Sequence, residues 1–241
     1  QSASAATARH RVKLPTAPMF QAVKLSTTVP GHPRGTRKVL LDDVSFEVPD
    51  NSLIAILGPS GAGKTTLLHA LTGLNPAETG YVYYGGRDLY ADYDQLRQHI
   101  GYVPQFDALH GALTLQQCLD FAAELRLSDP ATRATRTSEV MKTLGLTEHA
   151  QTLVKRLSGG QRKRASVAME LLSKPGLIFL DEPTSGLDPG LDSDVMAELR
   201  TLAHDPAERR IIFVVTHSLA SIRHCDMVLV MAPGGRLVAC D

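Results

Sequence analysis

The sequence predicts an α/β protein built on a mostly parallel sheet with helices on its faces. The first observation behind this prediction is a set of short apolar runs that suit buried strands, at residues 53–57, 177–180 and 211–215. These runs alternate with segments of helical spacing, and such alternation produces parallel sheets covered by helices. The second observation is a glycine-rich turn at residues 58–66, which joins the first apolar run to a helical segment at 66–71.

The other elements follow from the same period-two and helical patterns. Thr114 and Gln117 have the spacing of a capping box and open the first helix of an inserted helical region, which we place at residues 106–165. Further predicted helices are residues 131–144, 159–173 and 191–204, and the remaining predicted strands are 21–29, 39–48, 81–84, 100–103, 210–216, 227–231 and 236–240.

Composition and charge are those of an ordinary globular chain. Its 241 residues are 43% hydrophobic and 21% charged, which is enough for a large domain with a buried core. A formal net charge of +0 gives no support to a nucleic-acid partner, and no apolar run approaches the roughly 20 residues of a membrane-spanning helix. Cys118, Cys225 and Cys240 form no C-x-x-C pair, so we interpret them as packing residues in a reducing compartment.

The start of the chain differs from the rest in being small and polar, without the apolar core of a signal peptide. We interpret residues 1–15 as a linker or tail and residues 16–241 as one domain. The chain begins at Gln1 and stops at Asp241, just after a predicted strand, so we expect it to be part of a longer protein.

The glycine-rich turn reads GPSGAGKTT and matches the phosphate-loop pattern of a glycine, four residues, and Gly-Lys-Ser/Thr. A chance match is disfavoured because a strand precedes it and a helix follows. Its glycines allow backbone N–H groups to surround a phosphate chain, and the helix adds its N-terminal dipole. Lys64 can reach the β- and γ-phosphates, and Thr65 can offer its hydroxyl to Mg²⁺. The candidate nucleotide ligands are Gly58, Pro59, Ser60, Gly61, Ala62, Gly63, Lys64, Thr65 and Thr66.

Two acids follow the apolar run at residues 177–180. At the carboxyl end of a parallel strand near a phosphate loop, Asp181 can hold the shell of a Mg²⁺ ion. Glu182 can orient and deprotonate a water aimed at the γ-phosphate. Taken alone, the pair is equally compatible with an acidic surface turn.

A second glycine-rich helix start lies at residues 157–161, LSGGQ. Ser158 suits an N-cap, while Gly159 and Gly160 leave backbone N–H groups accessible, which makes a second anion site. By itself this pattern is more typical of a structural cap.

The ordered set GPSGAGKTT, Gln105, LSGGQ, LIFLDEP, SGLD and His217 resembles the nucleotide-binding domain of ATP-binding cassette (ABC) proteins, over nearly the whole chain from about residue 20. The resemblance implies a P-loop NTPase fold: an ABC-type ATPase core, an N-terminal antiparallel β subdomain and an inserted α-helical subdomain. It also implies Mg²⁺-dependent hydrolysis of ATP, with ATP and Mg²⁺ as the bound cofactors.

The resemblance carries residue roles as well. It implies that Glu182 is the catalytic base, that His217 contacts the γ-phosphate, and that Gln105 lies near Mg²⁺ and the attacking water. Thr65, Gln105 and Asp181 would then be the metal-site residues. Ser158, Gly159, Gly160 and Gln161 are the signature, which in this family closes over ATP held on the phosphate loop of a second chain.

Residues 160–172, GQRKRASVAMELL, resemble the White-type (G) subfamily of ABC exporters. This implies a head-to-tail dimer, expected as a homodimer, at the cytoplasmic face of the plasma (inner) membrane. The membrane domain would follow in the same polypeptide, and an upstream regulatory domain such as a forkhead-associated domain is compatible with this plan. A soluble ABC ATPase, a separate importer ATPase subunit and a non-catalytic interaction module remain alternatives. The basic residues 162–164 also suit a solvated helix face.

One feature departs from the family pattern. The family places an aromatic residue in the first strand region to stack on adenine, but residues 21–41 contain no Phe, Tyr or Trp. Thr28 and Val29 are the candidates at that position. We therefore expect weak discrimination between ATP and GTP.

Overall fold

A central six-stranded sheet contains the strands that lead into the sequence motifs. The structure, a computed structural model, describes residues 19–240 apart from 32, 34 and 106–108. The strand order is β10-β9-β3-β8-β7-β6; the strands are parallel from β9 to β6, and β10 runs antiparallel to β9. The strands are β3 (Ser52–Leu57), β6 (Ile100–Val103), β7 (Leu177–Asp181), β8 (Ile211–Val215), β9 (Met227–Ala232) and β10 (Arg236–Cys240).

A smaller antiparallel sheet has the order β2-β1-β4-β5. In β2 the apolar side chains of Val44, Phe46 and Val48 are buried and the residues between them are exposed, as period-two alternation requires. Phe20 at the start of the sheet packs against Phe213 of the central sheet, with ring centroids 5.1 Å apart. Its strands are β1 (Phe20–Pro30), β2 (Arg37–Val48), β4 (Thr79–Tyr84) and β5 (Arg87–Asp88).

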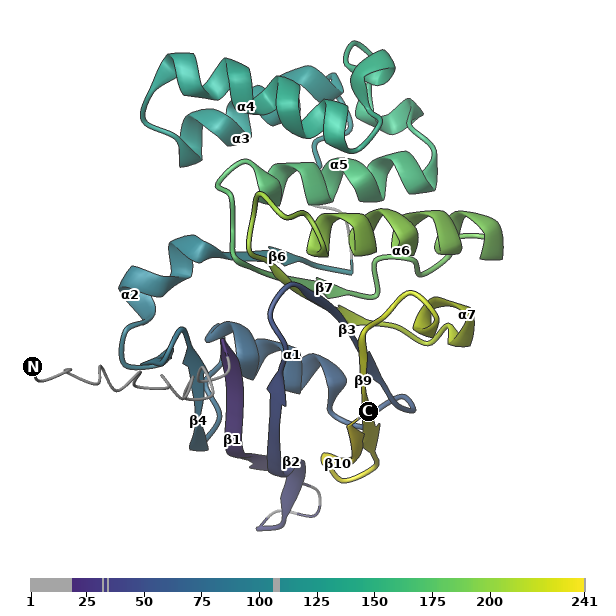
Figure 1. Ribbon diagram of the computed structural model, residues 1–241. Helices are drawn as coiled ribbons and strands as arrows, with labels where there is room; N and C mark the ends of the chain where they lie inside the picture. The colour runs from purple at the N-terminus through teal and green to yellow at the C-terminus, as the bar shows by residue number, and fades with distance from the viewer. Residues whose placement is uncertain (1–18, 32, 34, 106–108, 241) are drawn as a thin grey trace, which may run out of the picture.

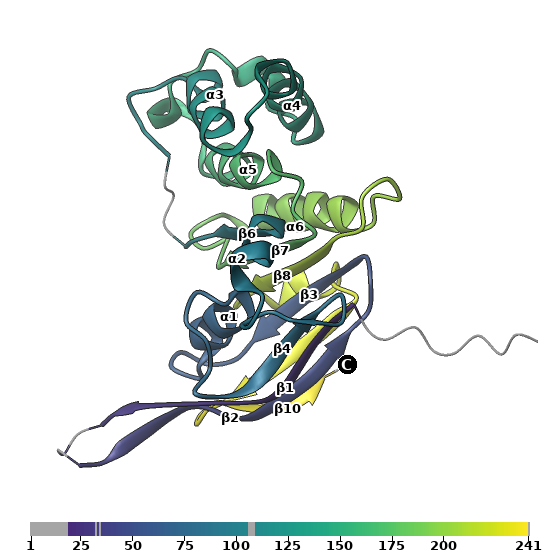
Figure 2. The ribbon, with the colours of Figure 1, turned by 90° about the vertical axis from the view of Figure 1, so that its left-hand side faces the viewer.

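Helices cover both faces of the central sheet (Figure 1). Helices α5 (Gly159–Leu171) and α6 (Pro189–Ala203) lie on one face, and α1 (Lys64–Thr72) lies on the other, between the two sheets (Figure 2). Helices α3 (Leu115–Arg126) and α4 (Pro130–Thr143) stand beyond α5. Two single-turn helices are α2 (Tyr93–Leu96) and α7 (Leu219–Ile222), and 3₁₀ turns occur at Arg97–His99, Thr147–His149 and Val154–Arg156.

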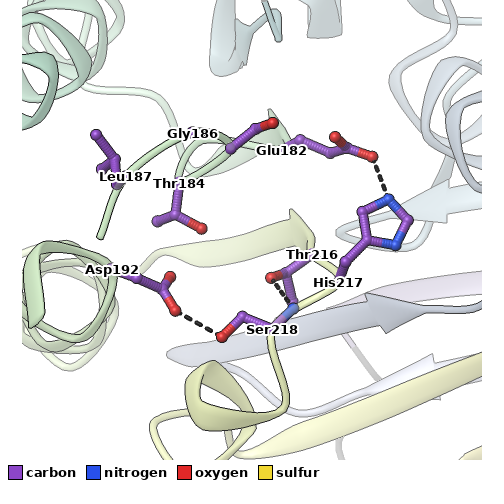
Figure 3. Close-up of a pocket in the computed structure, with 9 residues that line it drawn as sticks. Glu182, Thr184, Gly186, Leu187, Asp192, Thr216, His217 and Ser218 are labelled. Carbon is purple, nitrogen blue, oxygen red and sulfur yellow. Dashed lines mark hydrogen bonds and ion pairs between the residues drawn. The ribbon is translucent and has the colours of Figure 1, made fainter. Parts of the chain in front are cut away.

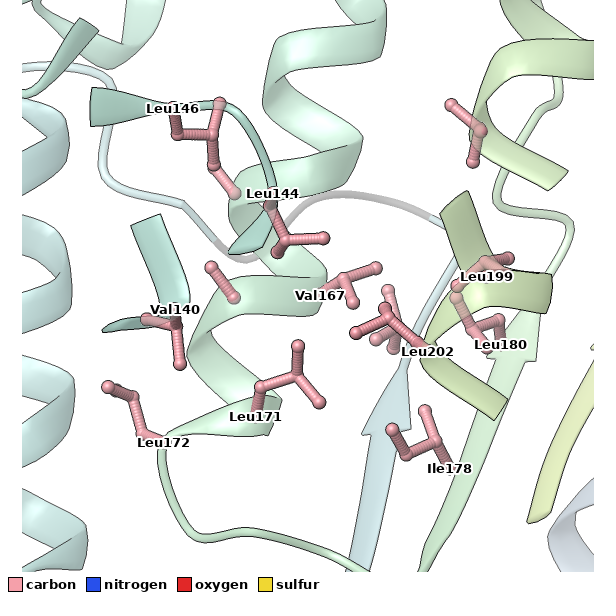
Figure 4. Packing of buried hydrophobic residues seen from close by; sticks show 14 of the residues in the cluster. Val140, Leu144, Leu146, Val167, Leu171, Leu172, Ile178, Leu180, Leu199 and Leu202 are labelled. Atoms are coloured by element: carbon pink, nitrogen blue, oxygen red, sulfur yellow. The ribbon is translucent and has the colours of Figure 1, made fainter. Parts of the chain in front are cut away.

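Two hydrophobic cores result, one on each face of the central sheet. Alternate residues of β7 serve opposite cores: Ile178 and Leu180 pack on the side of α5 and α6, whereas Leu177 and Phe179 pack on the side of α1. Figure 4 shows the first core, where side chains from α4, α5 and α6 meet those of the sheet. The sheet therefore fixes α1 and α5 on opposite sides of the molecule.

The predicted α/β fold, its parallel sheet and its antiparallel N-terminal sheet are confirmed. The predicted element limits differ from the observed ones by at most two residues. The helix expected at 191–204 begins at Pro189, because the Asp188 side chain caps it by accepting from the N–H groups of Gly190 and Leu191. The helix expected at 159–173 ends at Leu171.

Short elements were missed, because β5 and α2 span too few residues to show a period. The interpretation of all three cysteines as packing residues is also wrong in part. Cys118 is buried. Cys225 is partly buried, and this burial raises the pKa of its thiol to about 12. Cys240, however, is exposed on the antiparallel edge strand β10.

The predicted tail at residues 1–15 lies outside the described residues. The limits of the predicted insertion, 106–165, stay a prediction, although α3, α4 and the start of α5 fall within that range. Across the described part of the chain, no helix combines the length and apolar character needed to cross a bilayer.

Candidate active site

The phosphate loop joins the end of β3 to the start of α1, as the sequence predicts. Gly58 and Gly63 have φ values of 152° and 97°, and each lies against backbone. A Cβ atom at Gly58 would lie 2.5 Å from the carbonyl oxygen of Met231, and one at Gly63 would lie 2.3 Å from that of Leu40. Only glycine fits these two positions, so the tight loop follows directly from the sequence.

No side chain caps the start of α1, where Gly63 is the N-cap residue. Lys64 is only 7% exposed, and its Nζ donates to the carbonyl oxygens of Gly58 and Pro59 at 2.9 and 3.0 Å. A helix start with uncapped N–H groups and a buried ammonium group forms an anion site. This loop therefore fits the phosphate chain of a nucleotide.

Asp181 lies at the end of β7 and is 6% exposed. Burial raises the pKa of its carboxyl group, and a hydrogen bond from Thr65 works in the opposite direction. Asp181 and Thr65 thus place one carboxylate and one hydroxyl next to each other at the phosphate loop. Mg²⁺ is commonly held by one or two carboxylates together with substrate phosphates, so these residues fit that ion. The described residues contain no cluster of three or more His, Cys, Asp or Glu that could form a metal site of its own.

Glu182 contacts the two other predicted catalytic residues, Gln105 and His217. Its Oε2 accepts from the Gln105 amide at 3.0 Å, and its Oε1 lies 2.5 Å from Nε2 of His217 (Figure 3). The Glu182 backbone has φ of 47°, which is unusual outside glycine, and its N–H donates to the carbonyl of Val215 at the end of β8. Non-glycine residues in this region often mark functional sites. In this structure the Gln105 amide donates to Glu182, and the role of Gln105 as a metal-site residue stays a prediction.

The signature residues form a capped helix start. Ser158 Oγ accepts from the N–H of Gln161, and the Gln161 side chain accepts from the N–H of Ser158, which completes a capping box. The start of this helix lies against the loop after Glu182: a Cβ atom at Gly159 would be 2.8 Å from Leu187 Cδ2. The signature and the phosphate loop are not brought together, because α5 and α1 lie on opposite faces of the central sheet.

Sequence reasoning missed two contacts of the signature helix. Lys163 is only 6% exposed, and its Nζ donates to the backbone carbonyl of Gln105 at 2.6 Å. Arg164 pairs with Glu198 on α6 at 2.9 Å. The solvated-face interpretation of residues 162–164 is therefore wrong. The run of three basic residues was the available signal, but sequence alone could not indicate which of them turns inward.

A second missed group lies on the other side of His217. Asp192 in α6 is 5% exposed and accepts hydrogen bonds from Ser218 and Ser221. Together with Glu182 and His217 it lines a hollow of about 310 Å³ (Figure 3). Nothing in the spacing of these residues along the chain signals the contact.

Comparison with known proteins identifies the family. Residues 41–185 match the family model for the ABC transporter. The chain is 48% identical over 206 residues to the ABC transporter ATP-binding/permease protein Rv1747 of Mycobacterium tuberculosis, which covers 84% of this chain and 24% of the relative. It is 38% identical over 208 residues to ABC transporter G family member 21 of Arabidopsis thaliana, with 82% and 30% covered.

An import protein is similar as well. The chain is 36% identical over 194 residues to the sulfate/thiosulfate import ATP-binding protein CysA of Synechocystis, covering 80% of this chain and 54% of the relative. The chain thus spans between a quarter and about half of the length of these relatives.

Solved structures share the fold. Part of the ABC transporter complex cbiONQ, cbiO1 from Clostridium perfringens, superposes with a TM-score of 0.81 at 26% identity, covering 92% of this chain and 88% of that one. The ATP-binding cassette MJ0796, solved as a dimer with ADP and Pi, superposes with a TM-score of 0.78 at 24% identity, covering 92% and 98%. The chain therefore belongs to the ABC transporter family, as an ATP-hydrolysing nucleotide-binding domain.

Proposed function

We propose that this chain is the motor domain of an ABC exporter, in which two cassettes close head to tail on ATP and drive a membrane domain. The observation that carries the proposal is the position of Glu182. It lies between Gln105 and His217, and its chain neighbour Asp181 bonds to Thr65 of the phosphate loop. A base, its two orienting partners and the phosphate site thus belong to one connected group.

Each residue has a role that its contacts support. The uncapped start of α1 and the Lys64 ammonium group bind the β- and γ-phosphates of ATP. Thr65 and Asp181 would hold Mg²⁺, which when bound neutralises charge on the phosphates. Glu182 takes the proton from the attacking water, and His217 and Gln105 fix the orientation of its carboxylate. The hydrogen bonds on both carboxylate oxygens limit the rotation of that group.

The head-to-tail arrangement is supported by what one chain lacks. Ser158 lies at the start of α5, on the far side of the central sheet from the phosphate loop. In the described part of the chain, the start of α5 therefore does not face the phosphate loop of its own chain, whereas a second chain can supply such a helix start. Such closure would place N–H donors at the γ-phosphate and exclude water, and it makes ATP the link between the two chains.

The coupling to a membrane domain is supported by an apolar groove between α3 and residues 109–113. It has a volume of about 430 Å³, and Phe121 and Leu125 on its rim are 53% and 89% exposed. Contiguous exposed apolar surface of this kind is typical of interaction sites. The lining residues are Leu109, His110, Leu113, Cys118, Phe121, Ala122, Leu125, Arg126 and Met169.

A chain of polar contacts leads from this groove toward the catalytic residues. Arg126 at the groove pairs with Glu170 at 2.5 Å, and Glu170 accepts from the N–H of Tyr102 in β6 at 3.4 Å. Strand β6 ends two residues before Gln105.

In the full-length protein, Leu125→Glu should uncouple hydrolysis from transport, while the 241-residue chain with this change keeps its ATPase rate.

The exporter assignment, with the membrane domain C-terminal in the same polypeptide, is supported by the White-type signature helix. The relative at 48% identity carries ATP-binding and permease functions in one protein by its name, and another belongs to the G family. The import relative favours a second candidate, a separate importer ATPase subunit. Sequencing the gene downstream of the codon for residue 241 separates the two candidates. About six apolar stretches of about 20 residues each would support the exporter, and their absence would support the importer subunit.

The catalytic proposal is tested by Glu182→Gln, which keeps the shape of the side chain and removes its basicity. Turnover should fall about 10²–10⁴-fold while ATP still binds, and an ATP-bound dimer should accumulate on a sizing column. Glu148→Gln, at an exposed 3₁₀ position, is the matched control and should hydrolyse normally. Near-normal hydrolysis by the Glu182 variant would remove that residue from the role of base.

A further inference from the structure

We propose that Asp192 is a positioning residue that holds His217 within reach of Glu182. The inference rests on the proposed catalytic roles of those two residues. Asp192 lies in the first turn of α6, outside every sequence motif, and the residue is only 5% exposed. It is a buried ionisable group for which the hydrolysis mechanism has no direct use.

The carboxylate holds the segment that follows β8. Its Oδ2 accepts from Ser218 Oγ at 2.6 Å (Figure 3). The Ser221 hydroxyl donates to both oxygens at 2.9 Å. Ser218 is the residue next to His217, and Ser221 lies in the single-turn helix α7 that follows. The bonds therefore attach the segment after His217 to α6.

His217 has an anchored residue on each side. On one side Thr216 is 3% exposed, and its N–H donates to the carbonyl of Ile56 in β3 at 3.2 Å. On the other side Ser218 donates its N–H to Thr216 Oγ1 at 3.0 Å and its hydroxyl to Asp192. The His217 side chain is itself 51% exposed and contacts Glu182, so its position depends on these two backbone anchors rather than on close packing.

A purely structural role does not explain the choice of a carboxylate. Burying a charge is unfavourable unless it is paired, and an apolar residue would fill such a site at least as well. Among the residues that the structure describes, no Lys, Arg or His forms an ion pair with Asp192; its partners are the two hydroxyls and the start of α6. What a carboxylate offers here is a strong, directed acceptor for the residue beside His217.

Two serine variants separate positioning from stability. Ser218→Ala and Ser221→Ala each remove one hydroxyl from the same carboxylate, but only Ser218 adjoins His217. Displacing a reacting group by about 1 Å can lower turnover about 10²-fold. Ser218→Ala should therefore lower kcat about tenfold with KM for ATP within about twofold. Ser221→Ala, although its side chain is fully buried, should lower kcat less than threefold, whatever it does to the melting temperature.

A double-mutant cycle tests whether Asp192 acts through His217. Asp192→Ala should lower kcat about 10–100-fold in the otherwise unchanged 241-residue chain, and less than about twofold further when His217→Ala is already present. The exposed Asp194→Asn on the same helix is the control and should leave kcat unchanged. Thermal unfolding and ATP binding verify that each variant is folded.

The outcomes are distinguishable. If His217→Ala lowers kcat but Asp192→Ala lowers it equally with and without that change, Asp192 does not act through His217 and the inference is overturned while the catalytic proposal stands. The inference also fails if Ser221→Ala lowers kcat more than Ser218→Ala. If His217→Ala leaves kcat unchanged, the proposed role of His217 fails and the inference fails with it.

Discussion

Two helices of this chain begin with glycine-rich segments, and their first turns are built in opposite ways. Helix α1 starts at Gly63 without any side-chain cap, and a buried Lys64 lies across the loop. Helix α5 starts at Ser158 with a complete capping box that Gln161 closes. Both sequence patterns are typical of anion sites. Of these two helix starts, only that of α1 has no side-chain hydrogen bond to its first N–H groups and has a buried lysine beside it.

The difference supports the proposed division, in which the start of α1 binds ATP and the start of α5 completes the site of a second chain. The uncapped start of α1 needs an anion to satisfy its N–H groups, so it suits a tightly held phosphate chain. The start of α5 is already stabilised by its own side chains, so it can remain exposed until a second chain approaches. Their positions on opposite faces of the central sheet agree with this division.

The largest expected effect is at the uncapped start. Lys64→Ala removes the buried ammonium group that we propose binds the phosphates, so hydrolysis should disappear and the affinity for Mg-ATP should fall about tenfold or more. Circular dichroism should show an intact fold. Lys142→Ala, an exposed lysine of α4, is the control and should behave as the unchanged chain. An unaltered nucleotide affinity in the Lys64 variant would show that the phosphate chain binds elsewhere.

Asp181 belongs to the uncapped site, and burial raises the pKa of its carboxyl group. The folded state thus favours its protonated form, and its contribution to the free energy of unfolding declines as pH rises above the ordinary value of 3.8. In EDTA, Asp181→Asn should raise the melting temperature at pH 7 more than at pH 4, while Mg²⁺-dependent hydrolysis is lost. A variant that is less stable at pH 7 would contradict the stated cause of the pKa shift.

The two starts should also differ in how substitutions affect folding. Gly63→Ala introduces a Cβ atom into the carbonyl of Leu40 at a positive φ, so it should lower the free energy of unfolding by about 1–3 kcal/mol or more. Ser158→Ala only removes a cap and should lower it by about 1 kcal/mol. Urea titrations would measure both. Equal losses would show that the phosphate loop is less constrained than its glycines indicate.

Base recognition should show the smallest effect. Thr28, one candidate for the stacking position, instead donates its hydroxyl to Glu78 at 2.9 Å and accepts from Arg37 at 2.6 Å. Without a stacking aromatic, discrimination between ATP and GTP should be about tenfold or less, which is about 1.4 kcal/mol. Competition of GTP against a fluorescent ATP analogue measures it. A preference of a hundredfold or more would mean that other groups read the base.

The sequence was informative where a local pattern dictates local geometry. The phosphate loop could be predicted because a strand, three glycines and a helix must follow one another directly. The meeting of Gln105 and His217 at Glu182 was anticipated only through family resemblance, since 77 and 35 residues separate them from the glutamate.

Contacts made by residues without a motif could not be predicted. Asp192 and Ser218 are 26 residues apart on a helix and a turn, and their contact depends on how α6 packs over the sheet. Lys163 turns inward because the helix period places it toward Gln105, 58 residues away in the chain. The register of such packing is set by side-chain shape across both cores, which a single sequence does not reveal.

In the proposed dimer, an uncapped helix start from one chain and a capped helix start from another make one site. The direct measurement mixes two inactive proteins, Lys64→Ala and Ser158→Arg, and follows phosphate release against total protein concentration. Mixed dimers contain one site with Lys64 and Ser158 both intact, so activity should reappear on mixing and rise more steeply than linearly with concentration. Two results together would exclude a shared site. The mixture would recover no activity, and the ATPase rate per chain of the protein without substitutions would stay constant on dilution.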